Sequence, residues 1–323
     1  MARLRWGLIG AGDIAQKRVA PALRDLSNCD LVSINRSRSE LAERFANEFG
    51  ARKWFADWRE LIAEDEIDAV YIATPVYLHA EQTIAAAEAG KQVLCEKPMA
   101  LAVKQCDEMI AACRANNVKL GIAYYRRFYP VIGRVKQIIS AGEIGKVSFV
   151  QINAFEYFNP LPDDSRHWLI EREKSGGGPM IDFGCHRLEV LVNLFGSARR
   201  IESIVSSAVF GREVEDTATA LLQFENGECA SLTVTHASIE PQDTLDIYGS
   251  RGSIHVPALN AGDVIIKIGN VETRESHPAA ANLHAPLIED FVDSVLNDRE
   301  PVINGEVGRQ ISLMVEEIYA KGM

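Results

Sequence analysis

The sequence predicts an α/β protein of two domains: a doubly wound parallel sheet over residues 1–124, and an α+β domain over residues 125–323 with a large, mostly antiparallel open sheet. Three observations lead to this fold class. In the first part, short Val/Ile/Leu-rich runs alternate with segments of helical period, which is typical of βαβ units. From about Gly145 the apolar runs lie closer together and alternate with period two. A chain of 323 residues is long enough for about two domains.

Five strands are expected in the first domain. The segments Ser39–Phe49 and His79–Ala89 have the helical period, and Gly90 suits the left-handed residue that ends a helix. Pro21 should interrupt or end the first helix, because proline lacks the N–H of the helical hydrogen bond. The strands fall on the apolar runs Leu4–Gly10, Asp30–Asn35, Ala69–Thr74, Gln92–Glu96 and Val118–Tyr124.

Six strands are expected in the second domain, separated by turn sequences such as Glu225-Asn226-Gly227. A large open sheet must cover one of its faces, so we expect a homo-oligomer, a dimer or a tetramer. Two helices, Pro286–Leu296 and Gly305–Tyr319, should close the chain. The strands are predicted at Lys146–Tyr157, Arg200–Val209, Thr217–Phe224, Cys229–Thr235, Thr244–Tyr248 and Val264–Ile268.

Composition excludes several classes of partner. The chain has 34 Lys and Arg against 45 Asp and Glu, and its net charge of -11 opposes binding to nucleic acid or to an anionic membrane. Its six cysteines form no C-x-x-C pair, which fits reduced thiols in the cytoplasm. No signal peptide and no apolar run of bilayer-spanning length is evident. We therefore expect a cytoplasmic protein that binds neither nucleic acid nor membrane.

A glycine turn points to a dinucleotide. The stretch Gly10–Ala15 places G-x-G-x-x-A between the first strand and the first helix. Gly10 permits the tight turn, Gly12 lets the backbone approach a pyrophosphate, and Ala15 allows close packing of helix and strand. The alternative is a glycine-rich turn that binds nothing. Because strand, turn, helix and further βαβ units come in the required order, the sequence favours a Rossmann domain.

The second strand indicates which dinucleotide. It ends in Asn35-Arg36-Ser37-Arg38, without the acidic residue that an NAD site uses to bind the ribose hydroxyls. Two guanidinium groups stand where a 2′-phosphate would lie, and arginine binds phosphate bidentately. The prediction is NADP, with NAD as the alternative; a solvated arginine pair is the other interpretation of these residues.

Charged residues also follow a later strand. In a doubly wound sheet, ligands bind outside the carboxyl ends of the strands, where Thr74-Pro75 and Glu96-Lys97-Pro98 fall. Pro98 restricts the backbone of Lys97, whose ammonium should point into the nicotinamide crevice. An exposed lysine paired with Glu96 is the alternative. The residues predicted to bind the cofactor are Gly10, Gly12, Asp13, Ile14, Asn35, Arg36, Ser37, Arg38, Thr74, Pro75, His79, Glu96 and Lys97.

A helix of the second domain carries a narrow polar strip. After the glycines of Ser175–Pro179, Asp182 and His186 are spaced i,i+4 and share a face that Glu189 and Asn193 continue. The rest of this helix is apolar, so the strip should be buried, and buried ionisable groups gather at active sites. A solvated helix face is the alternative. Metal ligation is the weaker option because no third His or Cys cluster accompanies the pair, and we predict no metal.

Taken together, these motifs resemble the glucose-fructose oxidoreductase and inositol dehydrogenase family, over essentially the whole chain. Within it the chain is most similar to NADP-dependent sugar reductases such as the anhydrofructose reductases. The resemblance implies that Lys97, Asp182 and His186 are catalytic. It also implies that Tyr125-Arg126-Arg127-Phe128 and His167-Trp168 line the substrate pocket. Two positions depart from the family pattern: Val76, where Asn is frequent, puts a polar contact near the cofactor in doubt, and Glu189, where Asp is common, keeps the charge.

These residues predict a reaction. We expect hydride transfer between NADP(H) and a secondary alcohol or ketone carbon of a sugar, sugar derivative or cyclitol. His186 would act as acid or base, Lys97 would stabilise the alkoxide, and Asp182 would orient the substrate hydroxyl and His186. Trp168 would stack on the sugar ring, although core packing explains such residues equally well. The residues predicted to bind substrate are Lys97, Tyr125, Arg126, Tyr157, His167, Trp168, Asp182 and His186.

Two rival functions stay open at this point. One is a regulatory protein that binds the dinucleotide without turnover. The other is a hydrolase or lyase that uses a tightly bound nicotinamide transiently, with no net redox change. A binder would show affinity for NADPH without oxidising it, and a lyase would form product with sub-stoichiometric cofactor.

Overall fold

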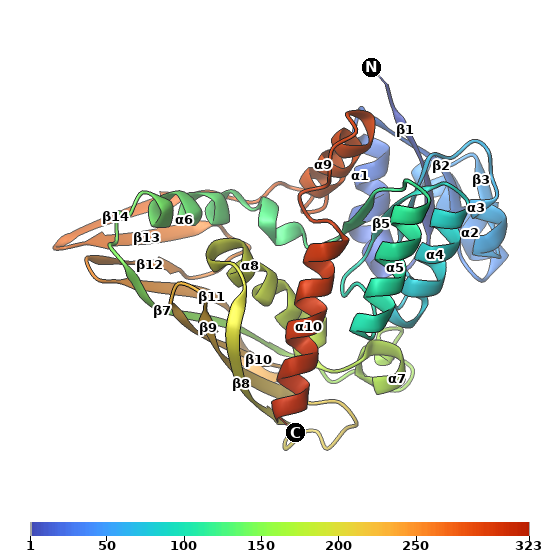
Figure 1. Cartoon of the computed structure of the whole chain (residues 1–323). Coiled ribbons are helices and arrows are strands. Elements are labelled where there is room, and N and C mark those ends of the chain that lie inside the picture. Colours follow the sequence, from blue (N-terminus) through green and yellow to red (C-terminus); the bar gives the residue numbers. More distant parts are fainter. Residues whose placement is uncertain (1, 323) are drawn as a thin grey trace. The chain divides into compact units, whose positions relative to one another are not determined.

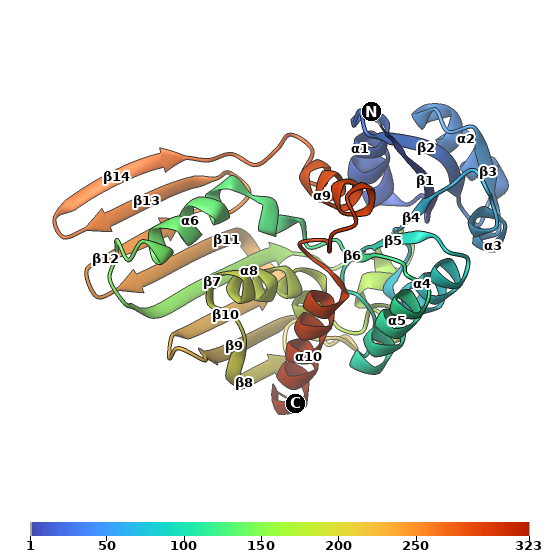
Figure 2. The ribbon, with the colours of Figure 1, turned by 45° about the horizontal axis from the view of Figure 1, so that its top comes forward.

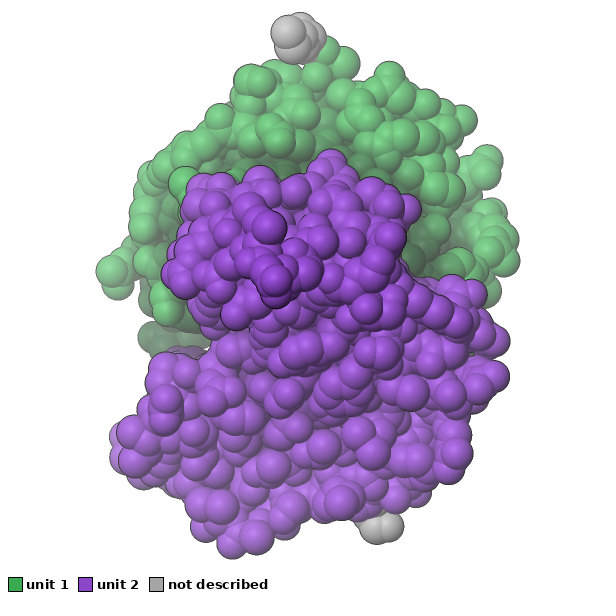
Figure 3. Space-filling model, turned by 90° about the vertical axis from the view of Figure 1, so that its left-hand side faces the viewer, with its two compact units in different colours: residues 1–125, 280–312 green, residues 126–279, 313–323 purple. Residues whose placement is uncertain are grey.

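The computed structural model describes residues 2–322, which divide into two compact units (Figure 3). Of the described residues, unit 1 contains 2–125 and 280–312, and unit 2 contains 126–279 and 313–322. The predicted second domain included all residues from 125 to 323. In the structure, residues 280–312 belong to unit 1 instead. The physical reason is packing: the Phe291 ring lies 5.6 Å from that of Trp6, and the Asn282 side chain donates to the Arg18 carbonyl.

Unit 1, drawn in blue to green in Figure 1 for residues 2–125, is built on a six-stranded parallel sheet. Its strand order is β3-β2-β1-β4-β5-β6. This order is that of a doubly wound dinucleotide-binding sheet, and it confirms the predicted fold class. Only β3 was not foreseen, because three residues are too few to show a period. The strands are β1 (Leu4–Ile9), β2 (Cys29–Asn35), β3 (Lys53–Phe55), β4 (Ala69–Ile72), β5 (Gln92–Cys95) and β6 (Leu120–Ile122).

Helices connect these parallel strands. Pro21 does not end the first of them: a π-helical segment, η1 (Ala15–Val19), leads directly into α1 (Ala20–Asp25), in which the proline occupies the first turn. The proline thus lies where the π-helical hydrogen-bond pattern changes to the α-helical one, and the helix continues through it. The other helices with residues in unit 1 are α2 (Ser39–Phe49), α3 (Trp58–Ile62), η2 (Val76–Leu78), α4 (His79–Glu88), α5 (Val103–Ala115), η3 (Tyr125–Phe128) and α9 (Ala285–Leu296).

Unit 2 contains an eight-stranded sheet in the order β14-β13-β12-β11-β7-β10-β9-β8. Only β7 and β10 pair in parallel, so the sheet is mostly antiparallel, as predicted. The sequence analysis missed the short strands β12 and β14. The strands are β7 (Val147–Tyr157), β8 (Ala198–Ser206), β9 (Thr217–Phe224), β10 (Cys229–Thr235), β11 (Ala237–Gly249), β12 (Gly252–Val256), β13 (Asp263–Ile268) and β14 (Val271–Ser276).

One face of this sheet is covered by helices, and α6 and α8 lie against it (Figure 2). The Phe195 ring of α8 packs 5.4 Å from the Phe224 ring of β9. No helix among residues 2–322 is both long and apolar enough to cross a membrane. The remaining helices are α6 (Pro130–Ser140), η4 (His167–Ile170), α7 (Arg172–Ser175), the π-helical η5 (Met180–Gly184), α8 (Cys185–Phe195) and α10 (Gly305–Gly322), which continues from unit 1 into unit 2.

Candidate functional site

The glycine turn after β1 has the geometry of a phosphate-binding loop. Gly10 has φ +91°, and a Cβ there would lie 2.8 Å from backbone atoms of Ala73 and Thr74, so only glycine fits. The Gly10 and Ala11 amides donate to the Asn35 carbonyl at 3.2 and 3.1 Å, which ties the turn to the end of β2. A Cβ on Gly12 would meet nothing within 4 Å. The backbone is therefore open there, and the turn fits the pyrophosphate of a dinucleotide.

At the end of β2, Asn35 has a structural role, whereas the side chains of Arg36 and Arg38 have no partner among the described residues. Asn35 is buried, and its amide donates to the carbonyls of Phe55 (3.1 Å) and Ala56 (3.0 Å), so this side chain holds β3. Arg36 is half-buried and Arg38 is exposed. Within residues 2–322 neither guanidinium has a hydrogen bond or an ion pair. Two unpaired positive groups thus remain where the sequence predicted a 2′-phosphate.

The ends of β4 and β5 are held together by a buried histidine. His79 is 1% exposed, and its Nδ1 and Nε2 each lie 2.9 Å from a carbonyl oxygen, of Pro98 and Thr74 respectively. Burial lowers the pKa of His79, against the opposite effect of the two carbonyls. The sequence analysis counted this residue among the cofactor contacts. Its contacts show that it joins the two loops at the ligand edge of the sheet.

Glu96 and Lys97 have different surroundings although they are adjacent. Glu96 is buried and accepts hydrogen bonds from the Tyr71 hydroxyl (2.8 Å), His284 Nε2 (3.1 Å) and the Lys97 amide (3.2 Å). Burial would raise the pKa of Glu96, but the hydrogen bond from His284 and the charges of His284 and Lys97 outweigh it, so the pKa is lowered. Lys97 follows β5, is only half-buried, and precedes a cis peptide bond to Pro98. Glu96 therefore fixes the loop, and Lys97 is the residue at the ligand edge.

The other cofactor candidates lie at the same edge. Asp13 is exposed and pairs with Lys17 at 2.8 Å, and Ser37 is exposed. The Thr74 hydroxyl donates to Gln82 at 2.7 Å. Ile14 and Pro75 are half-buried beside these residues in the chain.

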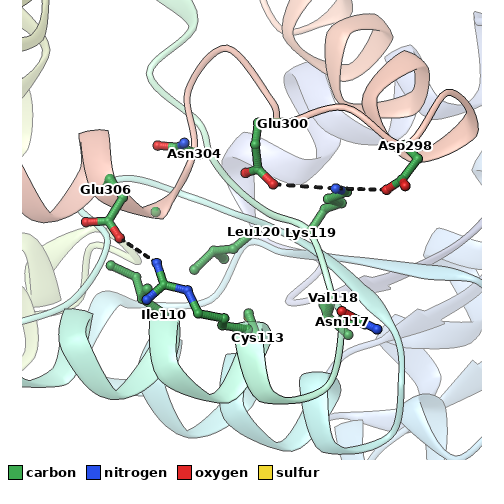
Figure 4. A pocket seen from close by; sticks show the side chains of 12 residues that line it. Ile110, Cys113, Asn117, Val118, Lys119, Leu120, Asp298, Glu300, Asn304 and Glu306 are labelled. Carbon is green, nitrogen blue, oxygen red and sulfur yellow. Dashed lines mark hydrogen bonds and ion pairs between the residues drawn. The ribbon is translucent and has the colours of Figure 1, made fainter.

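A pocket of about 600 Å³ in unit 1 lies at the opposite edge of the sheet (Figure 4). It surrounds the start of β6, where Lys119 pairs with Asp298 (3.0 Å) and Glu300 (3.4 Å). Ligands of doubly wound sheets bind at the carboxyl ends of the strands, whereas this pocket lies at an amino end. Its lysine is also already neutralised, so we do not assign it to the cofactor.

In unit 2, a buried carboxylate that the sequence did not reveal anchors the helix of the polar strip. Glu215 accepts hydrogen bonds from the amides of Gly178 (2.8 Å) and Met180 (3.1 Å) and from the Tyr319 hydroxyl (2.7 Å). A Cβ on Gly178 would lie 2.2 Å from the Glu215 carbonyl oxygen, and one on Gly177 would lie 2.1 Å from the Tyr319 hydroxyl oxygen. The glycines are therefore required by close approach, and Glu215 caps the start of the helix.

The helix places Asp182 and His186 differently. Asp182 lies on the π-helical segment η5 with its side chain 21% exposed, and His186 begins the buried part of α8 at 3% exposed. The polar strip is therefore embedded in the protein, as the apolar surroundings predicted. π-Helical turns inside α-helices are frequent at functional sites.

Glu189 continues the strip into the core. Its side chain is fully buried and pairs with the Arg127 guanidinium. Burial raises the pKa of Glu189 to about 7, in spite of the charge of Arg127. The carboxyl group is thus held close to its point of titration at neutral pH.

Asp182 faces two further titratable side chains, Glu156 at the end of β7 and His236 just after β10. The Nε2 atom of His236 lies 3.5 Å from Asp182 Oδ2 and 3.8 Å from Glu156 Oε1. One ligand atom from each of the three residues lies within 4.8 Å of the others, so the three side chains are close enough together to hold a metal ion. The sequence analysis missed Glu156 and His236, since neither has a local spacing to Asp182.

A pocket of about 630 Å³ in unit 2 includes Glu156 and Phe183 in its wall. It also contains Arg126, predicted to bind substrate, and Arg187, which bond to opposite oxygens of Asp243 at 3.4 and 2.6 Å. Burial raises the pKa of Asp243, but the two arginine charges outweigh it, and the pKa is lowered. The charges of Arg126 and Arg187 are thus partly neutralised by Asp243 in the pocket wall.

The remaining substrate candidates are spread over both units. In unit 1, the Tyr125 ring stacks 4.8 Å from His284 and under Arg18. In unit 2, Tyr157 is 60% exposed, and His167 and Trp168 are half-buried on η4. Lys97 belongs to unit 1, whereas Asp182 and His186 belong to unit 2.

Comparison with known proteins identifies both parts of the chain. A family described as "Oxidoreductase family, NAD-binding Rossmann fold" matches residues 4–124, and the "GFO/IDH/MocA C-terminal domain" matches residues 132–255. An oxidoreductase of Formosa agariphila is 31% identical over 294 residues, 90% of this chain and 90% of that protein. The 1,5-anhydro-D-fructose reductase of Ensifer adhaerens is 30% identical over 311 residues, 94% of this chain and 92% of the reductase.

A solved structure has the same fold. Levoglucosan dehydrogenase in complex with NADH and levoglucosan superimposes with a TM-score of 0.89, covering 99% of this chain and 97% of that chain. The sequence identity is 24%, so this similarity bears on the fold alone.

Proposed function

Because the chain belongs to the Gfo/Idh/MocA family of oxidoreductases, with an NAD-binding Rossmann fold, we propose that it transfers a hydride between NADP(H) and a secondary alcohol or ketone carbon of a sugar, sugar derivative or cyclitol. The observation that carries this proposal is the retention of the complete set of ionisable groups: Lys97 at the ligand edge of the parallel sheet, and Asp182 and His186 together on one helix of unit 2. A relative of this chain is named a reductase of an anhydro-sugar, which supports the substrate class.

The proposed roles follow from the chemistry of each side chain. When bound, NADP accepts a hydride from the reacting carbon or NADPH donates one. In the oxidative direction His186 takes the hydroxyl proton, while the Lys97 ammonium stabilises the oxygen as negative charge develops on it. Asp182 accepts a hydrogen bond from a neighbouring substrate hydroxyl and orients His186. In the reductive direction His186 returns the proton.

The test of these roles is turnover by single variants. His186→Ala and Lys97→Ala should each lower kcat by about 10²–10⁴-fold with ketosugar and NADPH, since a positioned acid–base group contributes that much. For His186→Ala, the affinity for NADPH should stay within about threefold of the wild type. His277→Ala is the matched control, because this histidine lies in a surface pair with Glu275. Normal turnover by both His186→Ala and Lys97→Ala would refute the assignment.

The preference for NADP rests on Arg36 and Arg38. Each guanidinium is unpaired within residues 2–322 and follows β2, where a 2′-phosphate would need a cation. A hydrogen bond to a charged group contributes about 1.5–3 kcal/mol, so Arg36→Ala should lower kcat/KM for NADPH roughly tenfold or more and leave that for NADH unchanged. Arg24→Ala, which removes an exposed pair with Asp25, is the control. An unchanged ratio of the two cofactors would favour NAD.

A homo-oligomer, dimer or tetramer, is also part of the proposal. The face of the eight-stranded sheet opposite α6 and α8 exposes Ile204 (72%), Leu221 (55%) and Phe149 (37%), which the strand register places on one side. Association would bury this row. Leu221→Glu should then reduce the mass measured by light scattering to that of one chain. The cysteines are thiols rather than disulfides, which fits the expected cytoplasmic location.

A further inference from the structure

The environment of His236 determines which of its nitrogens carries the proton. Arg212 Nη2 lies 2.7 Å from His236 Nδ1, and a guanidinium has donors only, so Nδ1 accepts this bond. The Arg212 position is itself fixed, because its side chain donates to the carbonyls of Phe158 (2.9 Å) and Glu215 (3.2 Å). His236 is therefore the neutral tautomer with its proton on Nε2.

The Nε2 atom of His236 lies beside two carboxylates and makes no hydrogen bond to either one. His236 is completely buried, and its ring is held between those of Phe158 and Phe183 at centroid distances of 5.0 and 5.1 Å. In this fixed orientation Nε2 lies 3.5 Å from Asp182 and 3.8 Å from Glu156. A metal ion at this cluster would need the lone pair of Nε2, which the tautomer replaces with a proton. Within residues 2–322, Nε2 is thus a buried donor without a hydrogen-bond partner, next to two carboxylates.

Glu156 has the exposure and charge of a binding group. Its side chain is 49% exposed and lines the pocket of about 630 Å³. Its pKa is raised by partial burial and by the charge of Asp182. Two carboxylates with an N–H between them offer acceptors to hydroxyl groups, and they repel an anionic ligand.

We propose that Glu156 is a second substrate-binding carboxylate beside Asp182, and that the Arg212–His236 pair is the positioning device for both. Asp182 and Glu156 accept hydrogen bonds from neighbouring hydroxyls of an uncharged polyol, and sugar acids and sugar phosphates are disfavoured at this end of the site. The inference rests on the proposed function, since it names the class of substrate for that reaction.

One measurement decides the tautomer without any turnover. In protein labelled with ¹⁵N-histidine, the His236 ring should show a protonated Nε2 and an unprotonated Nδ1 in two-dimensional NMR. A proton on Nδ1 overturns the positioning role even if the protein is an active reductase.

Two substitutions of His236 separate its donor from its acceptor. His236→Gln keeps an N–H that reaches the carboxylates, and His236→Asn keeps an acceptor for Arg212 but lacks that reach. His236→Gln should keep KM for the sugar within about threefold of the wild type. His236→Asn should raise this KM about tenfold, with a smaller change in kcat. Equal behaviour of the two variants contradicts the positioning role.

Glu156→Gln tests the binding carboxylate. It should raise KM for a neutral sugar about tenfold and improve use of the matching sugar acid relative to the neutral sugar. Calorimetry of sugar binding in the presence of NADP gives the same comparison without turnover. Unchanged affinity for both the neutral sugar and the sugar acid overturns the assignment of Glu156. A wild-type protein that binds sugar through Glu156 but never oxidises NADPH would refute only the proposed function.

Discussion

Between about pH 4.5 and 7 the folded protein should lose stability because of one buried carboxyl group, Glu189 on α8. Its pKa rises from 4.5 to about 7 in the folded state, because burial outweighs the charge of Arg127. The group therefore contributes stability that is fully present below its unfolded pKa and is lost as the pH rises through about 7. One pKa unit corresponds to about 1.4 kcal/mol, so this loss is on the order of 3 kcal/mol.

Glu189→Gln removes this titration and keeps the shape of the side chain. Urea denaturation of wild type and variant, from about pH 4.5 to 8, measures the free energy of unfolding of each. The difference between the two curves should grow in favour of the variant as the pH rises, and level off above about pH 7. Other titrating groups contribute equally to both proteins and cancel in the comparison.

Glu275 provides a control of opposite sign. The Arg134 hydrogen bond, followed by that of His277, lowers its pKa to about 2, so its stabilisation is present above pH 4.5 and is lost as the pH falls through 2. Its side chain is 30% exposed, so solvent reduces the effect. Glu275→Gln should therefore leave the slope above pH 4.5 unchanged. Parallel curves for wild type and Glu189→Gln would refute the reasoning.

Three further predictions concern backbone approach and helix capping. Gly10→Ala should weaken NADP binding at least about tenfold by calorimetry, because its Cβ would lie 2.8 Å from the Thr74 backbone; unchanged affinity would show that the turn does not hold the cofactor. Gly178→Ala should lower stability by more than about 2 kcal/mol and reduce kcat, since its Cβ would lie 2.2 Å from a carbonyl oxygen; a stable, fully active variant would contradict the close approach. Glu215→Gln should cost roughly 1.5–3 kcal/mol in urea denaturation and leave dinucleotide affinity intact, whereas a wild-type midpoint would argue against the cap.

The elements with a clear period were predictable from the sequence. Thr217–Phe224 and Cys229–Thr235 were predicted with their observed bounds, because alternate residues face the covered side of the sheet. The short strand Lys53–Phe55 was not, since three residues carry no period. The glycine turn was predictable because it is a local pattern with a local cause.

The surroundings of the site were less predictable. Asn35 and Glu96 follow the strands as expected, yet both side chains turn inward, and a position at a strand end does not fix that direction. Glu215 reaches the amides of Gly178 and Met180, and His236 reaches Asp182, from positions far along the chain. The sequence offers one indication of these two residues: each is a polar residue next to the end of a strand with alternating apolar positions.

The return of residues 280–312 to unit 1 has a consequence for how the protein is made. The β6 strand bonds to this late segment, since the Ile122 amide donates to the Ile303 carbonyl at 2.9 Å. Trp6 in β1 likewise packs on Phe291. During translation the nucleotide-binding half must wait for almost the entire polypeptide to leave the ribosome before its interior closes. A fragment ending at Tyr125 would expose this apolar surface, so excision of that half should yield an aggregating product.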